Sequence, residues 1–149
     1  MLEKYNRYKV LKVFLDSSTE SFRLREIARL AKISPPSIIN YLREFEKSAL
    51  IKKYIKNKVP FYTAVRDNNN FILYKKMSII HELNKSGFVD YLWDKISPEA
   101  IVLYGSFSRG ESTEHSDIDI FILGKEIQID VRKFENKLNK KIHLLFNGS

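Results

Sequence analysis

Residues 100–123 read AIVLYGSFSRGESTEHSDIDIFIL, and this stretch decides the fold of the second half of the chain. It begins with an apolar run that ends at Gly105-Ser106, a pattern that is typical of a buried strand followed by a tight turn. Ten residues further on, Asp117-Ile118-Asp119 opens a second strand with alternating polar and apolar positions. Residues two apart in a strand share a face, so both carboxylates should point the same way and Ile118 should point into the core.

A pair of carboxylates on one strand predicts a cation between them, because the two charges otherwise repel each other. Mg²⁺ is commonly held by one or two carboxylates together with the phosphates of a nucleotide. The glycine turn upstream leaves backbone N–H groups free and lets a ligand approach the main chain. The alternative reading of Asp117 and Asp119 is a polar strand start beside a loop, without a ligand.

The order Leu103-Tyr104-Gly105-Ser106, ten residues, then Asp117-Ile118-Asp119 resembles the signature of the DNA polymerase beta-like nucleotidyltransferase superfamily, especially its minimal single-domain members. The resemblance covers about residues 98–146. It implies nucleotide binding by Gly105, Ser106, Arg109 and Ser116, and metal binding and catalysis by Asp117 and Asp119. The implied reaction is attack of an acceptor hydroxyl on the α-phosphate of ATP or another NTP, with Mg²⁺ (or Mn²⁺) bound and pyrophosphate leaving.

Active members of that superfamily generally add a third carboxylate from a later strand, and this chain departs from them there. The remaining strand-like segment is 142–146, and its polar position is His143. Three readings stay open. His143 replaces the acid as base or metal ligand; Asp130 or Glu135 supplies the acid from a helix expected at 129–138; or the domain binds nucleotide and metal without efficient transfer. We expect His115 to lie in a solvent-facing loop.

The first half of the chain is strongly basic. Residues 1–66 contain 15 Lys and Arg against 6 Asp and Glu, whereas residues 67–149 contain 11 against 12. This asymmetry indicates a polyanion as the partner of the first half. A solvated basic surface without such a partner is the alternative.

Residues 1–66 are expected to form a helix at 5–15, a short helix at 24–31, a capped third helix from Ser34-Pro35 to residue 49, and two strands at 50–55 and 59–65. The third helix should turn Ile38, Phe45 and Ala49 inward. The element order and the phrase LREIARLAKIS at 24–34 resemble a winged helix-turn-helix DNA-binding domain. The third helix would then enter the major groove and the hairpin lysines would meet phosphates. The predicted DNA contacts are Ser37, Asn40, Arg43, Lys47, Lys53, Lys56 and Lys58.

The sequence thus predicts an α+β protein with a winged helix-turn-helix domain at 1–66, a helical linker at 67–97, and a small mixed-sheet nucleotidyltransferase-like domain at 98–149. The expected partners are double-stranded DNA and a nucleotide. The resemblance implies a partner protein as a further possible acceptor, because minimal members often act as antitoxins that modify a partner. A homodimer that forms through the helices at 71–96 is a separate possibility. The absence of cysteine excludes disulfides and thiolate metal sites, and the absence of a long apolar stretch predicts a cytoplasmic protein without membrane contact.

Two functions compete at this stage. The first is an enzyme that transfers a nucleoside monophosphate to a hydroxyl. The second is a DNA-binding transcriptional regulator whose degenerate nucleotidyltransferase domain only binds or senses nucleotide.

Overall fold

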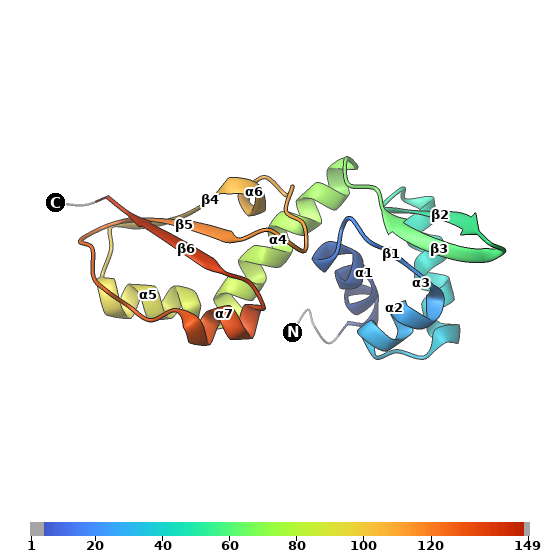
Figure 1. Cartoon of the computed structure of the whole chain (residues 1–149), viewed down its shortest axis with the longest axis horizontal. Coiled ribbons are helices and arrows are strands. Elements are labelled where there is room, and N and C mark those ends of the chain that lie inside the picture. Colours follow the sequence, from blue (N-terminus) through green and yellow to red (C-terminus); the bar gives the residue numbers. More distant parts are fainter. Residues whose placement is uncertain (1–4, 148–149) are drawn as a thin grey trace. The chain divides into compact units, whose positions relative to one another are not determined.

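A computed structural model describes residues 5–147 and divides the chain into two compact units, Met1–Ile72 and Leu73–Ser149. The boundary lies within helix α4 (Asn69–Lys85). Each unit combines helices with a three-stranded sheet (Figure 1), so the predicted mixed α+β class is confirmed. Among residues 5–147 no helix combines the length and the apolar character needed to cross a membrane.

The N-terminal unit consists of three helices and a small antiparallel sheet. In chain order its elements are α1 (Asn6–Asp16), β1 (Ser21–Phe22), α2 (Leu24–Ala31), α3 (Pro35–Lys47), β2 (Ile51–Lys56) and β3 (Val59–Ala64). The strand order is β1-β3-β2. Phe14, Ile27 and Ile38 are fully buried between the helices and the sheet, which explains why the helical apolar spacing located these helices.

The end of α3 differs from the prediction. The helix stops at Lys47, and Ala49 is exposed with a φ of 58°, so the expectation that Ala49 faces the core is wrong. The left-handed residue reverses the chain, and the N–H of Leu50 then donates to the carbonyl of Phe45 at 2.9 Å. Leu50, 6% exposed, occupies the buried place instead.

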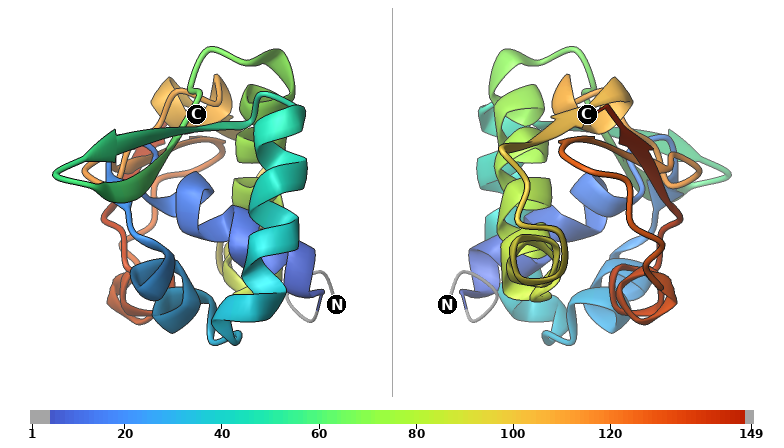
Figure 2. Two further views of the ribbon diagram at one scale, coloured as in Figure 1. Left: turned by 90° about the vertical axis from the view of Figure 1, so that its right-hand side faces the viewer. Right: turned by 90° about the vertical axis from the view of Figure 1, so that its left-hand side faces the viewer.

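Strands β2 and β3 form a hairpin that extends past the helices of its unit (Figure 2). Its two-residue turn is Asn57-Lys58, with φ values of 51° and 64°. Two positive φ values are what a tight type I′ turn needs, and this turn matches the twist of the two strands. Residues 52–60 are all exposed, so the lysines of the hairpin are available to a ligand.

The C-terminal unit contains a mixed sheet with the order β4-β5-β6. Strand β4 runs antiparallel to β5, and β6 runs parallel to it, so the predicted mixed sheet is confirmed. The elements that follow α4 are α5 (Phe88–Ile96), β4 (Ala100–Tyr104), α6 (Gly105–Ser108), β5 (Ile118–Leu123), α7 (Arg132–Leu138) and β6 (Ile142–Phe146).

The two faces of this sheet have different surroundings. Helices α5 and α7 lie on one face (Figures 1 and 2), and Ile118, Ile120 and Ile122 are buried in the core there. On the opposite face Val102 is 45% and Tyr104 37% exposed. The prediction that residues 100–104 form a buried strand is therefore wrong for one face, because α5 and α7 pack on the other face and leave this one open. The open face is the one that carries Asp119.

Helix α7 begins at Arg132 rather than at residue 129. Ile129 and Val131 pack against the core before the helix starts. The carboxylate of Asp130 accepts a hydrogen bond from the backbone N–H of Arg132 at 3.0 Å. The apolar residues that suggested a longer helix are thus core contacts of an irregular segment.

Candidate functional site

The register of the sheet brings three side chains into one row. Asp119 on β5 pairs with Tyr104 on β4 and with His143 on β6. Paired residues in neighbouring strands point to the same face, so all three lie on the open side of the sheet. Asp117 immediately precedes β5 and shares this face, because it is two residues from Asp119.

His143 contacts both aspartates. Its Nε2 lies 3.3 Å from Oδ2 of Asp117, and its Nδ1 lies 3.8 Å from Oδ1 of Asp119. The exposed fractions of the side chains are 41% for Asp117, 28% for Asp119 and 59% for His143. The cluster is therefore open to a ligand from solvent.

Gly105 lies directly against the carboxylate of Asp119. A Cβ atom on residue 105 would overlap Oδ2 of Asp119 and come within 3.2 Å of its Cγ. The φ of Gly105 is 74°, a conformation that side-chain-bearing residues rarely adopt. The Ser108 hydroxyl donates to the Gly105 carbonyl at 2.7 Å and holds the turn in this shape. Backbone and carboxylate thus approach closely only because residue 105 has no side chain.

The other predicted nucleotide-binding residues lie around this turn with partners of their own. Ser106 is half-buried, and its carbonyl accepts the N–H of Glu111 at 3.0 Å. Arg109 is exposed, and its Nε donates to Oε2 of Glu111 at 3.0 Å. The Ser116 hydroxyl accepts the N–H of Thr113 at 2.9 Å, which closes the loop before Asp117. The Nε of Arg109 is thus engaged with a neighbouring carboxylate.

The two acids considered on the helix side are engaged elsewhere. Asp130 forms an exposed pair with Arg132, and the hydrogen bonds from Arg132 lower the pKa of the Asp130 carboxyl to about 2. Glu135 accepts the backbone N–H of Ile142 at 2.8 Å and so fixes the start of β6. His143, in contrast, lies beside both aspartates. His115 lies in a loop with its side chain 86% exposed, as expected.

Two lysines near α6 escaped the sequence analysis. The Nζ atoms of Lys75 and Lys140 lie 6.0 Å and 5.8 Å from the ring centroid of Phe107. They come from α4 and from the segment before β6, so no local spacing connects them to the glycine turn. They place positive charge beside α6, with Lys75 nearly buried at 6% exposed.

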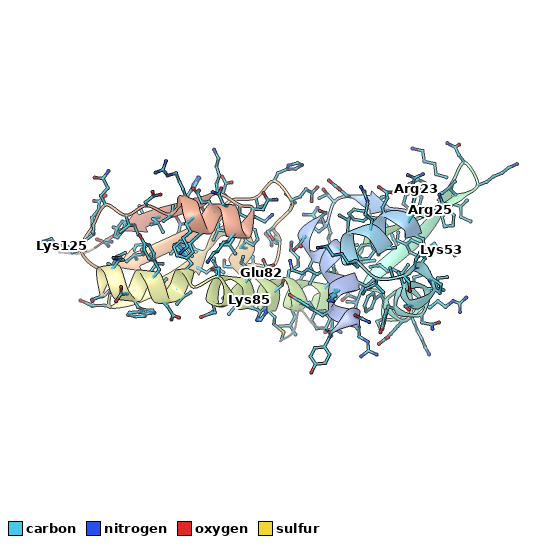
Figure 3. The ribbon with its side chains drawn as sticks, turned by 90° about the horizontal axis from the view of Figure 1, so that it is seen from below. Arg23, Arg25, Lys53, Glu82, Lys85 and Lys125 are labelled. Atoms are coloured by element: carbon cyan, nitrogen blue, oxygen red, sulfur yellow. The ribbon has the colours of Figure 1, made fainter. Side chains whose placement is uncertain are left out.

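The predicted DNA-contacting residues of the N-terminal unit are all exposed. Ser37, Asn40 and Arg43 follow one another at helical spacing along the outer face of α3. Figure 3 labels Lys53 on β2, where its Nζ lies 5.9 Å from the Tyr62 ring centroid. Lys53 and Lys56 are three residues apart in β2 and therefore point to opposite faces of the hairpin. Lys58 lies in the turn of the hairpin, and Lys47 is the last residue of α3.

The donors on the open face of the sheet suit a cation that is shared with another ligand. Within residues 5–147 no group of three or more His, Asp and Glu side chains has the geometry of a complete metal-binding set. Two carboxylates on one face, with a glycine turn against one of them, match the way Mg²⁺ is held jointly by protein and phosphate oxygens. These residues therefore fit a divalent ion that arrives with a phosphorylated ligand.

The comparisons with known proteins bear on the C-terminal unit. Residues 87–147 match the family described as Polymerase beta, Nucleotidyltransferase. The match extends from the start of α5 to the end of β6, so it contains Gly105, Asp117, Asp119 and His143. It supports the nucleotidyltransferase superfamily for this part of the chain, as the sequence motif predicted. Comparison with curated proteins and with solved structures found no match.

Proposed function

We propose that the C-terminal unit binds a nucleoside triphosphate with a divalent metal ion and transfers the nucleoside monophosphate to a hydroxyl acceptor. The observation that carries this proposal is the approach of Gly105 to the carboxylate of Asp119, with Asp117 on the same face of β5. A glycine turn beside two carboxylates suits the joint binding of phosphates and a cation. The family match over residues 87–147 supports the same reaction class.

Each residue has a defined task in this proposal. Asp117 and Asp119 would hold the metal ions, which stabilise charge on the attacking and leaving oxygens when bound. Gly105 and Ser106 would receive the triphosphate, and Arg109 would offer its guanidinium to phosphate oxygens. The acceptor hydroxyl would approach across the open face of the sheet, where Tyr104 and His143 are exposed.

Incubation of the full chain with ATP labelled on the α-phosphate, in Mg²⁺ or Mn²⁺, tests this function. A mixed protein extract supplies acceptor hydroxyls, and pyrophosphate release is measured in parallel. We expect covalent label with the wild type, and a loss of about 100-fold or more with Asp117→Asn, because charge stabilisation at the reacting phosphate disappears.

Asp130→Asn is the matched control, since it removes an exposed carboxylate outside the cluster. It should label like the wild type. Metal-dependent ATP binding by the wild type without label or pyrophosphate would contradict transfer. That result would favour the second function, a regulator whose C-terminal unit only senses nucleotide, which the imidazole in place of a third acid also supports.

For the N-terminal unit we propose binding to double-stranded DNA as a winged helix-turn-helix domain. The excess of basic residues in 1–66, the exposed outer face of α3 and the exposed basic hairpin support this proposal. Residues Ser37, Asn40 and Arg43 would face base edges, and the hairpin lysines would meet phosphates. Arg23 and Arg25, labelled in Figure 3 at the start of α2, are exposed and add to the basic surface.

Removal of two hairpin charges tests the DNA proposal. The double variant Lys56→Gln, Lys58→Gln should bind duplex DNA more weakly than the wild type. The slope of log affinity against log salt concentration should shrink by about 2, because each lost phosphate contact releases about one counterion fewer. Fluorescence anisotropy between low and moderate salt measures both quantities.

The control is Lys95→Gln, Lys125→Gln, which removes two exposed charges from the C-terminal unit. It should leave the slope unchanged. Wild-type affinity that does not vary with salt would contradict the proposal, since binding through phosphates must depend on ionic strength.

A further inference from the structure

The hairpin of β2 and β3 carries an aromatic pair that packs into neither hydrophobic core. The rings of Tyr54 and Phe61 are stacked, with their centroids 5.6 Å apart and an interplanar angle of 16°. The two residues are direct partners across the strands, and neither belongs to a core formed by the described residues. Tyr54 is 40% exposed and Phe61 is half-buried. Core packing therefore does not explain why two aromatic rings lie here.

The register places this pair on the outer face of the hairpin. Ile51 in β2 and Tyr62 in β3 are buried and belong to the core of the unit. Side chains in a strand alternate between the two faces. Tyr54 is three residues from Ile51, and Phe61 is adjacent to Tyr62, so both rings point away from the core. The outer face of the hairpin is therefore the face that a ligand would meet.

Two lysines share this face with the aromatic pair. Lys52 and Lys56 lie two residues from Tyr54 in β2, one on either side, and both are exposed. Strand geometry of about 3.3 Å per residue places the two lysines about 13 Å apart along the strand. Lys53 lies on the other face, with its Nζ 5.9 Å from the Tyr62 ring centroid. The outer face thus presents an aromatic surface between two positive charges.

This arrangement has the chemistry of a site for unpaired nucleotides. Lysine side chains contact phosphates, and aromatic rings stack on bases of any identity. In a duplex the faces of each base are covered by its neighbours, so exposed rings on a sheet stack on bases that are unpaired. Base edges in a duplex are read instead by polar side chains, such as those assigned to the outer face of α3. The aromatic pair therefore indicates a single strand as its ligand.

We propose that the outer face of the hairpin binds single-stranded nucleic acid, with unpaired bases stacked on Tyr54 and Phe61 and with phosphates at Lys52 and Lys56. This inference rests on the proposed nucleic-acid function of the N-terminal unit and adds a second substrate class to it. Single-stranded DNA and RNA share the groups that this face would recognise. The hairpin would then hold an unpaired strand, while α3 reads duplex base edges.

Two single-stranded probes with equal numbers of phosphates test the stacking. An oligothymidylate of about 12 nucleotides, a length within the range of single-strand sites, is titrated with the full chain, and an abasic oligomer of equal length is titrated in parallel. Fluorescence anisotropy measures both affinities. We expect the wild type to bind the oligothymidylate at least about fivefold more tightly, because the stacking of a single base contributes this factor or more. An oligouridylate shows which sugar the face prefers.

Removal of either ring should erase this difference. Tyr54→Leu and Phe61→Leu keep apolar bulk on the hairpin, and each should weaken oligothymidylate binding about fivefold or more while the abasic oligomer binds as before. Tyr54→Trp keeps a stacking ring and should bind like the wild type, which covers the case in which leucine disturbs the hairpin. The matched control is Tyr5→Leu, because Tyr5 is 59% exposed and precedes α1. It should bind both oligomers like the wild type.

A lysine variant separates phosphate contacts from stacking. Lys52→Gln should weaken the binding of both oligomers alike, and the slope of log affinity against log salt concentration should shrink by about 0.7, the value for one phosphate of a single strand. Tyr54→Leu should leave this slope unchanged. A loss of slope in Tyr54→Leu would mean that the variant displaces the lysines, and the stacking role would be overturned.

The outcomes also separate this inference from duplex binding. Equal affinity of the wild type for the oligothymidylate and the abasic oligomer overturns the stacking site and leaves the proposed duplex function standing. Equal weakening of duplex and single-strand binding by Tyr54→Leu likewise overturns it, because the pair would then serve the hairpin as a whole. Absence of salt-dependent binding to duplex and single strands alike overturns the proposed function and the inference with it.

Discussion

At the scale of single residues, the arrangement of the acidic cluster depends on Gly105, which has no side chain. Asp119 can keep its position only while residue 105 lacks a Cβ atom. The φ of 74° adds a second reason, because a residue with a side chain is strained by about 1–2 kcal/mol there. The sequence pattern indicated the glycine as a turn residue, and the structure adds its contact with the carboxylate.

Gly105→Ala should therefore damage the site beyond its effect on stability. We expect metal-dependent ATP binding to weaken about tenfold or more, because the new methyl group must displace the Asp119 carboxylate. Titration of ATP in the presence of Mn²⁺, followed by calorimetry, measures this change.

Gly87→Ala is the control, because Gly87 also has a positive φ, 86°, but no atom within 4 Å of an added Cβ. Its cost in free energy of unfolding should be similar, at about 1–2 kcal/mol, and its ATP binding should equal that of the wild type. Equal binding by the two variants would contradict the role assigned to the Gly105–Asp119 contact.

At the scale of elements, local periodicity predicted most helices and strands, and tertiary context decided the rest. Helix α2 has the predicted bounds, Leu24–Ala31, because its apolar spacing is regular. Strand β1 was missed because it has two residues and pairs with β3 some forty positions later. Helix α7 was predicted to begin too early, because Ile129 and Val131 are apolar. Both residues pack against the core from the segment that precedes the helix.

The strands of the C-terminal unit show the same limit. An apolar run such as residues 100–104 is compatible with burial on both faces or on one, and only the packing of α5 and α7 on a single face reveals that the other face is open. The motif predicted a strand that begins at Asp117, whereas β5 begins at Ile118 and carries Asp119 alone. The one polar position of the last strand singled out His143, but its contacts depend on the parallel register of β5 and β6. Lys75 and Lys140 gave no sequence signal, because their proximity to Phe107 is purely tertiary.

At the scale of the whole molecule, two hydrophobic cores and two charge balances divide the chain in the same way. Phe14, Ile27 and Leu42 belong to the first core, and Ile118 and Ile120 belong to the second. The basic excess lies in residues 1–66, whereas residues 67–149 are close to neutral. The proposed polyanion partner and the proposed phosphate-and-metal site would thus each belong to a unit with its own core.

Separate cores predict separate unfolding. Ile27→Ala removes a fully buried side chain from the first core and should lower the stability of that unit by about 2–5 kcal/mol. Hydrogen exchange of backbone amides should then accelerate in α1 and β3 while β5 keeps its protection, because local stability follows local burial. Ile120→Ala, in the second core, should instead accelerate exchange in β5 and leave α1 and β3 protected. Equal acceleration in both units by Ile27→Ala would mean that the chain unfolds as one cooperative body, and the division by core and charge would not describe its energetics.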